Sequence, residues 1–441
     1  MLENKKFGMI SLGCDKNRVD AERLLDVIRS RGGEITDDIS EADILIVNTC
    51  AFLEESRKEA IETVLECDAY RSGNLEKLVV SGCLPEKYIG ELFPSLTEGD
   101  VFLGCNDAEE LFSALERSYR EGRVNGVGQG CEHTQGRVLT TPAHYAYLKI
   151  ADGCNNFCTY CLIPKIRGKY RSYPIEELVK EAESLGDLSE LILVAQDVTR
   201  YGIDLYGEKS LVKLIRALTS LENIGSVRLL YCYPDVIDDA LIAEMRDNPK
   251  VVKYIDIPLQ HSEDRVLKLM NRKGTRAEYL ALIAKLRENI PGIAIRSTFI
   301  EGFPTETEEE SEALADFLQE AKLTNCGFFA YSREPDTPAY KLKGQIPEAV
   351  KKRRVGRLYG VQEKISAEFL AGFVGKNIEV LCDGIDYENG RFEGRAYFSA
   401  PEIDGKVYFN AANACQGERY TVRVTRSDSY DLYGETEDYQ T

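Results

Sequence analysis

The first part of the chain alternates short apolar runs with amphipathic stretches. Apolar runs typical of strands lie near residues 7–12, 43–47, 77–80 and 101–103. The segments between them have helical periodicity near residues 17–31, 52–68 and 85–93. Strands that are apolar on both faces and alternate with helices form a parallel sheet covered by helices. We therefore predict a parallel α/β domain over residues 1–120.

A second alternating series starts at Tyr145, after a polar, glycine-rich stretch that we interpret as a linker over residues 121–140. Its strand-like runs lie near residues 145–150, 190–195, 227–232, 254–258, 293–300 and 326–331. Six strand–helix units in fewer than 200 residues favour a partial (β/α)6 barrel over the complete eight-stranded form. We expect this barrel within residues 141–372.

The last part of the chain, residues 373–441, changes to a period of about two. Short strands bounded by glycine, aspartate and asparagine predict a small antiparallel β-barrel. The expected strands lie at residues 378–381, 395–398, 407–409 and 420–424. Before them, residues 349–370 have the pattern of an amphipathic helix with a basic start, which we interpret as a solvated connecting helix.

Composition places this chain of 441 residues, 43% hydrophobic and 29% charged, among folded proteins outside the membrane. No window approaches the roughly 18 consecutive apolar residues that a membrane-spanning helix needs. The N-terminal residues show no apolar leader, so we expect a cytoplasmic protein. The formal net charge of -19 opposes a nucleic-acid partner, because phosphate binding needs a basic face, and it favours a basic protein partner.

Thirteen cysteines in a long cytoplasmic chain favour thiolates that serve metals or catalysis rather than disulfides. The strongest motif is formed by Cys154, Cys158 and Cys161, a C-x3-C-x2-C run directly after an apolar strand. Three thiolates this close can bind three irons of a 4Fe-4S cluster and leave the fourth iron open to an external ligand. A structural zinc site is the alternative, but zinc needs four ligands and the nearby fourth candidate is His144.

A second set of cysteines consists of Cys14, Cys50 and Cys83, each just past the carboxyl end of a predicted strand. Those ends lie on one edge of a parallel sheet, so the three thiols could converge on a second cluster with one open iron. Cys105 follows a fourth strand and ranks below them as a ligand. From spacing alone, thiols that merely pack at the sheet edge stay an alternative. We interpret the remaining cysteines as small hydrophobic residues: Cys67, Cys131, Cys232, Cys326, Cys382 and Cys415.

The C-x3-C-x2-C run at the end of the first barrel strand resembles the signature of radical S-adenosylmethionine (SAM) enzymes. The resemblance implies that the reduced cluster cleaves SAM to a 5'-deoxyadenosyl radical. Tyr160 stands where that superfamily usually has an aromatic residue beside the adenine, with ordinary packing as the alternative. For further SAM contacts we expect strand ends, with Gln196 and Arg296 as candidates. No side chain outside the clusters is predicted to be catalytic.

A three-cysteine N-terminal domain, a radical SAM barrel and a small C-terminal barrel together resemble the methylthiotransferase family, in which the last barrel is called TRAM. Residues 12–20 (LGCDKNRVD) and 258–262 (PLQHS) are similar to its RimO-type branch, which modifies a ribosomal protein rather than tRNA. His261 is a marker of that branch and not an assigned catalyst. The chain departs from the family pattern, without touching a cluster ligand, at Ala21, Tyr173 and Thr305.

This resemblance implies methylthiolation of the β-carbon of an aspartate in small-subunit ribosomal protein twelve, free or in the ribosome. It implies two 4Fe-4S clusters, SAM as both radical source and methyl donor, and an electron donor such as flavodoxin or ferredoxin. From residue 374 onward, seven Lys or Arg stand against thirteen Asp or Glu, which suits a basic protein and disfavours tRNA. Acidity that serves only solubility is the alternative.

Two other functions stay open from the sequence. A tRNA methylthiotransferase would carry the same two clusters, so only its substrate would differ. A non-enzymatic RNA-binding or metal-binding module would instead have a basic barrel and no SAM cleavage. After the radical motif, alternating basic residues would share one face of an extended segment and orient a substrate carboxylate, or form a solvated loop. These residues are Lys165, Arg167, Lys169 and Arg171.

Overall fold

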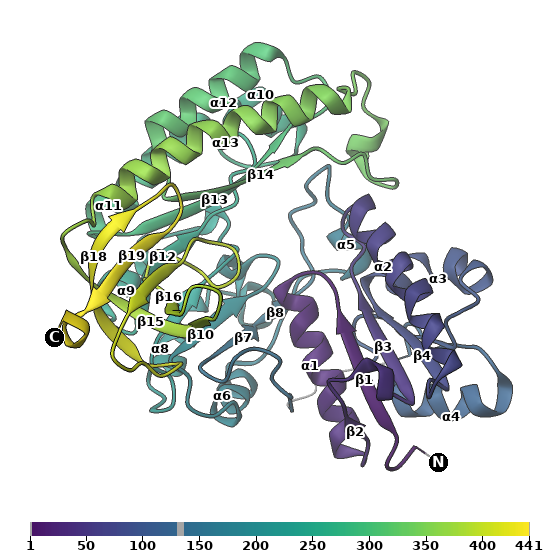
Figure 1. The fold of residues 1–441 in the computed structure, drawn as a ribbon. Coiled ribbons are helices and arrows are strands. Elements are labelled where there is room, and N and C mark those ends of the chain that lie inside the picture. The colour runs from purple at the N-terminus through teal and green to yellow at the C-terminus, as the bar shows by residue number, and fades with distance from the viewer. Residues whose placement is uncertain (1, 130–135, 441) are drawn as a thin grey trace. The chain divides into compact units, whose positions relative to one another are not determined.

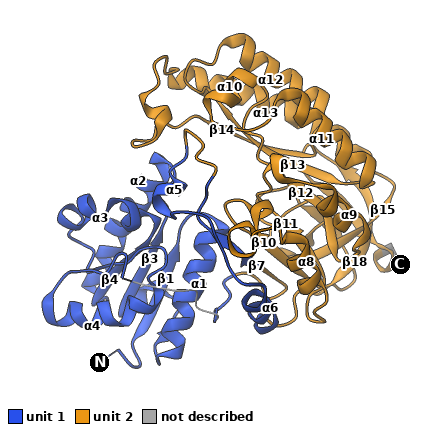
Figure 2. Ribbon diagram, turned by 180° about the vertical axis from the view of Figure 1, so that it is seen from behind, with its two compact units in different colours: residues 1–140, 147–155, 161–185 blue, residues 141–146, 156–160, 186–441 orange. Residues whose placement is uncertain are grey.

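The computed structural model describes residues 2–129 and 136–440, which fall into two compact units (Figure 2). The first unit comprises residues 1–140, 147–155 and 161–185, and the second comprises residues 141–146, 156–160 and 186–441. The division passes through the C-x3-C-x2-C segment. Cys154 and Cys161 therefore belong to the first unit, and Cys158 belongs to the second.

A six-stranded parallel sheet is the framework of the first unit (Figure 1). Its order is β2-β1-β3-β4-β5-β6, and all neighbouring strands are parallel. The strands are β1 (Lys6–Ser11), β2 (Glu34–Ile35), β3 (Ile44–Thr49), β4 (Lys77–Gly82), β5 (Val101–Phe102) and β6 (Val124–Asn125). The predicted parallel α/β fold is confirmed. Strand β6 lies inside the stretch that we interpreted as a linker, where Val124 is buried at the sheet edge.

Helices cover both faces of this sheet. Ile44 and Ile46 of β3 pack in the same core as α1 (Asp15–Ser30) and α4 (Leu111–Glu121). Their neighbours along the strand, Leu45 and Val47, pack on the opposite face with α2 (Glu54–Cys67) and α3 (Cys83–Ser95). Successive side chains of a strand point to opposite faces, so an unbroken apolar run is what a strand between two helical layers requires. The first unit also contains β8 (Ala151–Asp152), β9 (Arg171–Ser172), α5 (Ile163–Ile166) and α6 (Ile175–Ser184).

The second unit is built on a sheet of order β14-β13-β12-β11-β10-β7, although residues 147–149 of β7 belong to the first unit. Its strands are β7 (Tyr145–Lys149), β10 (Glu190–Val194), β11 (Val227–Leu229), β12 (Val251–Asp256), β13 (Ala294–Glu301) and β14 (Asn325–Ala330). The helices between and after them are α7 (Ile203–Tyr206), α8 (Leu211–Thr219), α9 (Asp239–Asp247), α10 (Asp264–Leu269), α11 (Arg276–Asn289), α12 (Glu308–Ala321) and α13 (Glu348–Ala371). This six-stranded sheet, which does not close on itself, confirms the predicted partial (β/α)6 barrel.

Helix α13 is not the solvated connector that its basic start suggested. Lys351 is buried and donates to the carbonyl oxygen of Tyr331 at 2.6 Å. Arg354 is also buried and contacts the carboxylate of Glu306 at 2.7 Å. The helix therefore packs against the sheet and α12, and its cations fix the segment after β13.

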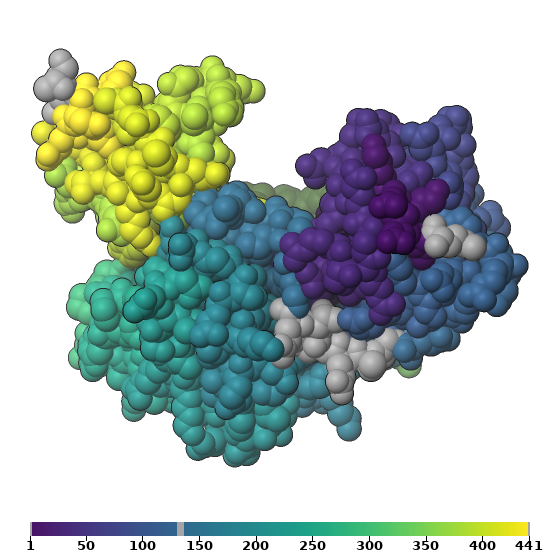
Figure 3. Space-filling model, turned by 90° about the horizontal axis from the view of Figure 1, so that it is seen from below, coloured from purple at the N-terminus to yellow at the C-terminus, as the bar shows by residue number. Residues whose placement is uncertain are grey.

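A closed five-stranded β-barrel ends the chain, and its residues form the yellow lobe in the space-filling view (Figure 3). Its strands are β15 (Asn377–Asp386), β16 (Arg391–Arg395), β17 (Val407–Asn410), β18 (Arg419–Ser427) and β19 (Leu432–Thr436). All pairs are antiparallel except β17–β19. The strand that we expected at residues 395–398 lies earlier, because β16 ends at Arg395 and a turn follows. In the part of the chain that is described, no helix has the length and apolar character needed to cross a membrane.

Candidate iron–sulfur sites

Three cysteines of the first unit meet at the carboxyl edge of its sheet. Cys14, Cys50 and Cys83 follow β1, β3 and β4, which are neighbours in register. Gly13 has a φ of +99°, and a side chain there would lie 2.9 Å from the Cβ of Cys50 and 3.3 Å from its Sγ. Burial, together with the nearby Cys83 and Cys14 thiolates, raises the pKa of Cys50 to about 11. Mutual repulsion of this kind is what a bound cation would relieve.

The side chain of Asn17 joins the three strand ends. Its amide nitrogen donates to the carbonyl oxygens of Leu12 at 3.2 Å and Thr49 at 3.0 Å. Its oxygen accepts from the Cys83 thiol at 3.4 Å. Asn17 is buried on the first helix, so one amide holds the β1 and β3 ends and the β4 thiol together. Asn17 could not be singled out from the sequence, except by its place in a family motif.

Arg167 also contacts this site. Its guanidinium donates to Asn17 Oδ1 at 2.6 Å and to Cys83 Sγ at 3.4 Å. It also pairs with Asp20 at 2.6 Å and with Asp152 at 3.2 Å. Hydrogen bonding from Cys105 and the charge and hydrogen bond of Arg167 lower the pKa of Cys83 to about 6. A thiolate, the form that binds iron, is thereby favoured at Cys83 near neutral pH.

The basic segment after the radical motif differs from our expectation. Residues 163–166 form helix α5 rather than an extended strand, so the alternating cations do not share one face. Arg167 is buried in the network just described, while Lys165, Lys169 and Arg171 are exposed. Arg167 is therefore neither part of a solvated loop nor free to bind a substrate carboxylate.

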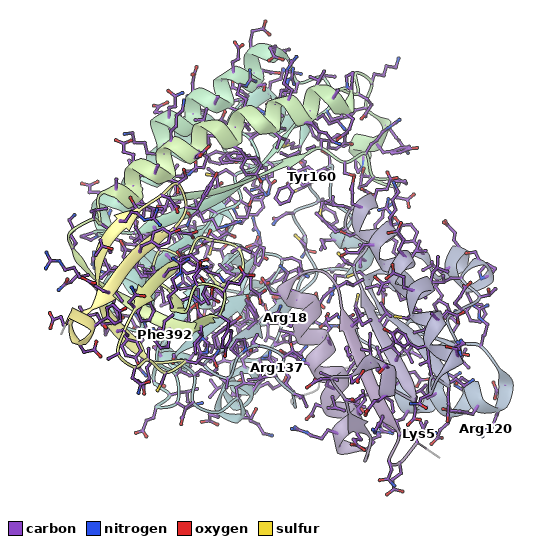
Figure 4. The ribbon with its side chains drawn as sticks, in the orientation of Figure 1. Lys5, Arg18, Arg120, Arg137, Tyr160 and Phe392 are labelled. Carbon is purple, nitrogen blue, oxygen red and sulfur yellow. The ribbon has the colours of Figure 1, made fainter. Side chains whose placement is uncertain are left out.

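The buried charges around Arg167 extend to β7. Lys149 is buried and donates to Asp20, and it lies 3.4 Å from Asp152. Arg137, labelled in Figure 4, forms further pairs in the first unit, with Glu181 at 3.2 Å and with Glu22 at 3.4 Å. Removing one partner of a buried ion pair is strongly destabilising, because it leaves an unpaired buried charge.

The loop of the C-x3-C-x2-C motif is shaped by backbone contacts within the first unit. Gly153 has a φ of +77°, and a side chain there would collide with the carbonyl of Lys169. The amide of Cys154 donates to the carbonyl oxygen of Gly168 at 3.2 Å. The Sγ of Cys161 accepts from the amide of Ile163 at 3.4 Å. Both cysteines are half-buried, so their thiols are reachable by a ligand.

In the second unit, the turn before and after Cys158 is held by residues 269–272. The amide of Thr159 donates to the carbonyl of Met270 at 3.0 Å, and Asn271 donates to the carbonyls of Asn156 at 3.3 Å and Phe157 at 3.0 Å. Asn271 adopts a φ of +56°, which asparagine tolerates better than most residues. Residues 269–272 therefore hold the loop that carries Cys158 in place.

Two further residues beside Cys158 were missed in the sequence. The Sγ of Cys158 lies 3.9 Å from Arg272 and 3.9 Å from the hydroxyl of Tyr233. The guanidinium of Arg272 stacks 4.0 Å above the Tyr233 ring and is buried. Neither Arg272 nor Tyr233 was assigned a role from the sequence.

The predicted SAM contacts lie at different places in the second unit. Tyr160 (Figure 4) packs against a core that includes Met270 and Phe303. Gln196 is half-buried directly after β10, beside the buried Asp197. Arg296 on β13 lies 3.1 Å from Asp256 and 3.3 Å from Asp404, so its charge is balanced by two carboxylates. Their roles in SAM binding stay predictions.

His261 lies in a buried carboxylate pocket of the second unit. Its Nε2 is 3.5 Å from the Glu306 carboxylate, and Glu301 is close enough to complete a potential metal-binding trio. However, its Nδ1 accepts from the amide of Glu263 at 3.0 Å. The proton of the neutral ring is therefore assigned to Nε2, which then cannot bind a metal.

The other cysteines fall into three classes. Cys67, Cys232 and Cys382 are buried, as expected of small hydrophobic residues. Cys326 is half-buried, and Cys415 is exposed, so the expectation is wrong for Cys415. Cys131 lies outside the described residues.

The chain matches three protein families. Residues 6–104 match the uncharacterized protein family UPF0004, residues 148–318 match the Radical SAM superfamily, and residues 374–436 match the TRAM domain. Among solved structures, the radical S-adenosylmethionine methyltransferase TsrM from Kitasatospora setae superposes with a TM-score of 0.54 at 16% identity. That likeness covers 76% of this chain and 77% of TsrM, and at such identity it shows the fold alone.

Full-length relatives are much more similar. The ribosomal protein uS12 methylthiotransferase RimO of Clostridium botulinum is 46% identical over 441 residues, which is 98% of each chain. The protein of the same name from Clostridium tetani is 44% identical over 435 residues, which is 97% of each chain. The family expected from the cysteine motifs is confirmed. The chain therefore belongs to the RimO family of radical SAM methylthiotransferases.

Proposed function

We propose that this enzyme methylthiolates the β-carbon of an aspartate in ribosomal protein uS12. The observation that carries the proposal is the meeting of Cys14, Cys50 and Cys83 at one sheet edge, in a chain that also has the C-x3-C-x2-C motif. Two separate three-thiol sets fit a reaction that needs both a radical and a sulfur atom. Relatives over 40% identical along their whole length carry the name of uS12 methylthiotransferases.

The six cysteines would hold two 4Fe-4S clusters. Cys154, Cys158 and Cys161 would bind the radical cluster, and the set at the sheet edge would bind an auxiliary cluster. When bound, the radical cluster and SAM would supply a 5'-deoxyadenosyl radical. The auxiliary cluster would take part in the insertion of the sulfur atom, and a second SAM would supply the methyl group. Each set offers three protein thiols, which leaves one iron for an external ligand.

The protein's own residues position these thiols. Arg167 and Asn17 hold Cys83 at the auxiliary site by the hydrogen bonds described above. Arg272 places a buried cation next to Cys158. Such outer partners orient metal ligands and set the potential of a cluster. We assign no side chain to proton transfer or covalent catalysis.

For SAM itself we propose Tyr160 and Gln196. Tyr160 packs at the loop that carries Cys158, and Gln196 follows β10, next to the Asp197 that accepts from Asn156 at 2.8 Å. Tyr160 therefore lies within the C-x3-C-x2-C motif, and the residue after Gln196 is hydrogen-bonded to Asn156 of the same motif. Arg296 is the weaker candidate, because Asp256 and Asp404 already balance its charge. It would act on SAM only if one of those pairs opened.

The partner that we propose is a strongly basic protein. The chain carries a formal net charge of -19, and the segment from residue 374 onward carries seven basic against thirteen acidic residues. This negative charge speeds the association with a basic ribosomal protein and repels RNA. A reduced flavodoxin or ferredoxin would deliver the electron, in the cytoplasm.

The test offers two substrates to the same enzyme. The anaerobically reconstituted and reduced chain is incubated with SAM and either uS12 or tRNA, and the mass of each substrate is measured. We expect a methylthio increment on one aspartate of uS12 and none on tRNA. Modification of tRNA alone would move the chain to the tRNA branch, and modification of neither by an enzyme that cleaves SAM would contradict the proposed substrate.

A further inference from the structure

Cys105 is a fourth thiol at the auxiliary site of the first unit. It follows β5, the strand beside β4, and its Sγ lies 3.7 Å from the Sγ of Cys83. Both residues are almost fully buried, with exposed fractions of 6% for Cys83 and 7% for Cys105. No role for Cys105 follows from the three-thiol assignment, so its position needs its own explanation.

The distance between the two sulfurs is that of two ligands on one metal. Metal–sulfur bonds of about 2.3 Å in tetrahedral geometry place two thiolates of the same metal about 3.8 Å apart. Thiolates on different irons of a cluster lie farther apart, because the irons themselves are separated. Cys83 and Cys105 therefore reach the same metal position without a rearrangement of the backbone.

The backbone holds Cys105 in place. Leu103 donates to the carbonyl of Val80 at 2.9 Å, and Gly82 donates back to the carbonyl of Leu103 at 3.2 Å, so the β4 and β5 ends are tied together. The amide of Cys105 donates to the Glu86 carboxylate at 3.0 Å. A side chain at Gly104 would collide with the same carboxylate. The thiol thus has a fixed position beside Cys83.

The surroundings also suit a second thiolate. The guanidinium of Arg167 lies 3.4 Å from Cys83 Sγ, so a positive charge is already next to the pair. A buried cation offsets the repulsion between two neighbouring thiolates. The Cys105 thiol, which donates to Cys83 in the metal-free protein, would lose its proton to solvent when it binds iron.

We propose that Cys105 is a reserve ligand of the auxiliary cluster, able to bind the iron that Cys83 binds. The inference rests on the proposed auxiliary cluster and goes beyond it by adding a ligand. Its consequence is that the two thiols can replace one another on one iron, whereas Cys14 and Cys50 have no such substitute among the contacts of the described residues.

The experiment measures iron and sulfide per chain after anaerobic reconstitution of the full-length protein, with circular dichroism as the check of folding. Cys50→Ala should lose about half of the iron, because one of two four-iron clusters lacks a ligand. Cys83→Ala should keep the parent content, because Cys105 takes its place. The double variant Cys83→Ala/Cys105→Ala should fall to the level of Cys50→Ala. Cys67→Ala, a buried thiol of the same core, is the matched control and should keep all of its iron.

The outcomes separate the two proposals. A folded Cys83→Ala variant that loses half of its iron would overturn the reserve ligand and leave the auxiliary cluster intact as an assignment. Full iron in Cys50→Ala would contradict the auxiliary cluster itself, and the reserve ligand with it. If Cys83→Ala does not fold, Cys105→Ala decides. Its auxiliary iron should pass to a chelator several-fold faster than in the parent chain, and an equal rate would overturn the proposal.

Discussion

Glu190 shows how strongly one residue of the second unit depends on its partners. It is buried between Arg228, at 2.8 Å, and Arg395, at 3.0 Å. Although burial alone would raise its pKa, the two guanidinium groups hold the pKa at about 2. The carboxylate is therefore ionised in the native protein over the whole physiological range.

We expect Glu190→Gln to cost about 3–5 kcal/mol of stability at neutral pH, because it leaves buried arginine charge unpaired. The folded pKa is lowered from 4.5, so this stabilisation is complete above 4.5 and is lost as the pH falls towards about 2. Melting temperatures by circular dichroism should therefore differ widely at pH 7 and less at pH 4. Glu379→Gln, which breaks an exposed pair with Arg419, should change little. A similar small loss in both variants would contradict the argument.

Glu301 shows the opposite shift. Burial first, and then repulsion from Glu306, raise its pKa from 4.5 to about 8. The native state then holds a proton that the unfolded state has released, so stability falls as the pH rises from 4.5 to about 8, by up to about 1.4 kcal/mol per pH unit. Glu301→Gln should flatten this decline in melting temperature between pH 5 and pH 8. Glu312→Gln, an exposed neighbour of Arg357, should keep the parent profile. An unchanged slope in Glu301→Gln would show that the carboxyl is ionised in the native protein.

The six proposed cluster cysteines could be predicted because their signal is local. A short motif, or a cysteine just past an apolar strand, is visible in the chain itself. The supporting contacts are not, since Arg167 and Cys83 are far apart in sequence and meet only when the sheet has formed. The same applies to Tyr233 beside Cys158. Sequence patterns identify the proposed ligands, while the residues that tune them depend on the tertiary fold.

At the scale of elements, the strands buried between helices were the easiest to predict. Continuous apolar runs such as residues 44–47 are typical of strands in a sheet covered on both faces. The barrel was harder, because its strands are short and half-exposed, and β19 contains Gly434 and polar residues that hide its period. Strand β6 was missed because two residues carry no periodic signal.

The turn from β4 into α3 depends on a glycine with a positive φ. Gly82 has a φ of +95°, and a side chain there would lie 2.6 Å from Asn48 Oδ1 and 2.7 Å from the carbonyl oxygen of Thr49. Gly82→Ala should therefore cost at least about 2 kcal/mol through strain. It should also displace Thr49 and with it Cys50, which has no substitute ligand, and so lower the iron content of the reconstituted protein. Gly90→Ala, within the same helix and with no atom within 4 Å, should be neutral or slightly stabilising. Melting temperature and iron analysis of both variants check this, and equal behaviour would contradict it.

At the scale of the whole molecule, the net charge governs the rate of association with the proposed partner. A chain of net charge -19 attracts a basic protein, and salt screens this attraction. The screening length falls from about 30 Å in 0.01 M salt to about 3 Å in 1 M salt. The association rate with uS12 should fall by about tenfold or more across this range in stopped-flow measurements. A rate that does not change with salt would show that the acidity serves only solubility, and tight binding of tRNA at low salt would contradict the choice of partner.

One chain is proposed to carry two clusters with separate tasks. The most direct measurement follows 5'-deoxyadenosine and methylthiolated uS12 in the same anaerobic reaction, for the parent chain, Cys158→Ala and Cys50→Ala. We expect the parent to form both products, Cys158→Ala to form neither, and Cys50→Ala to form 5'-deoxyadenosine without methylthiolated uS12. Methylthiolation by Cys50→Ala, or SAM cleavage by Cys158→Ala at the parent rate, would contradict the division of tasks between the two sets of cysteines.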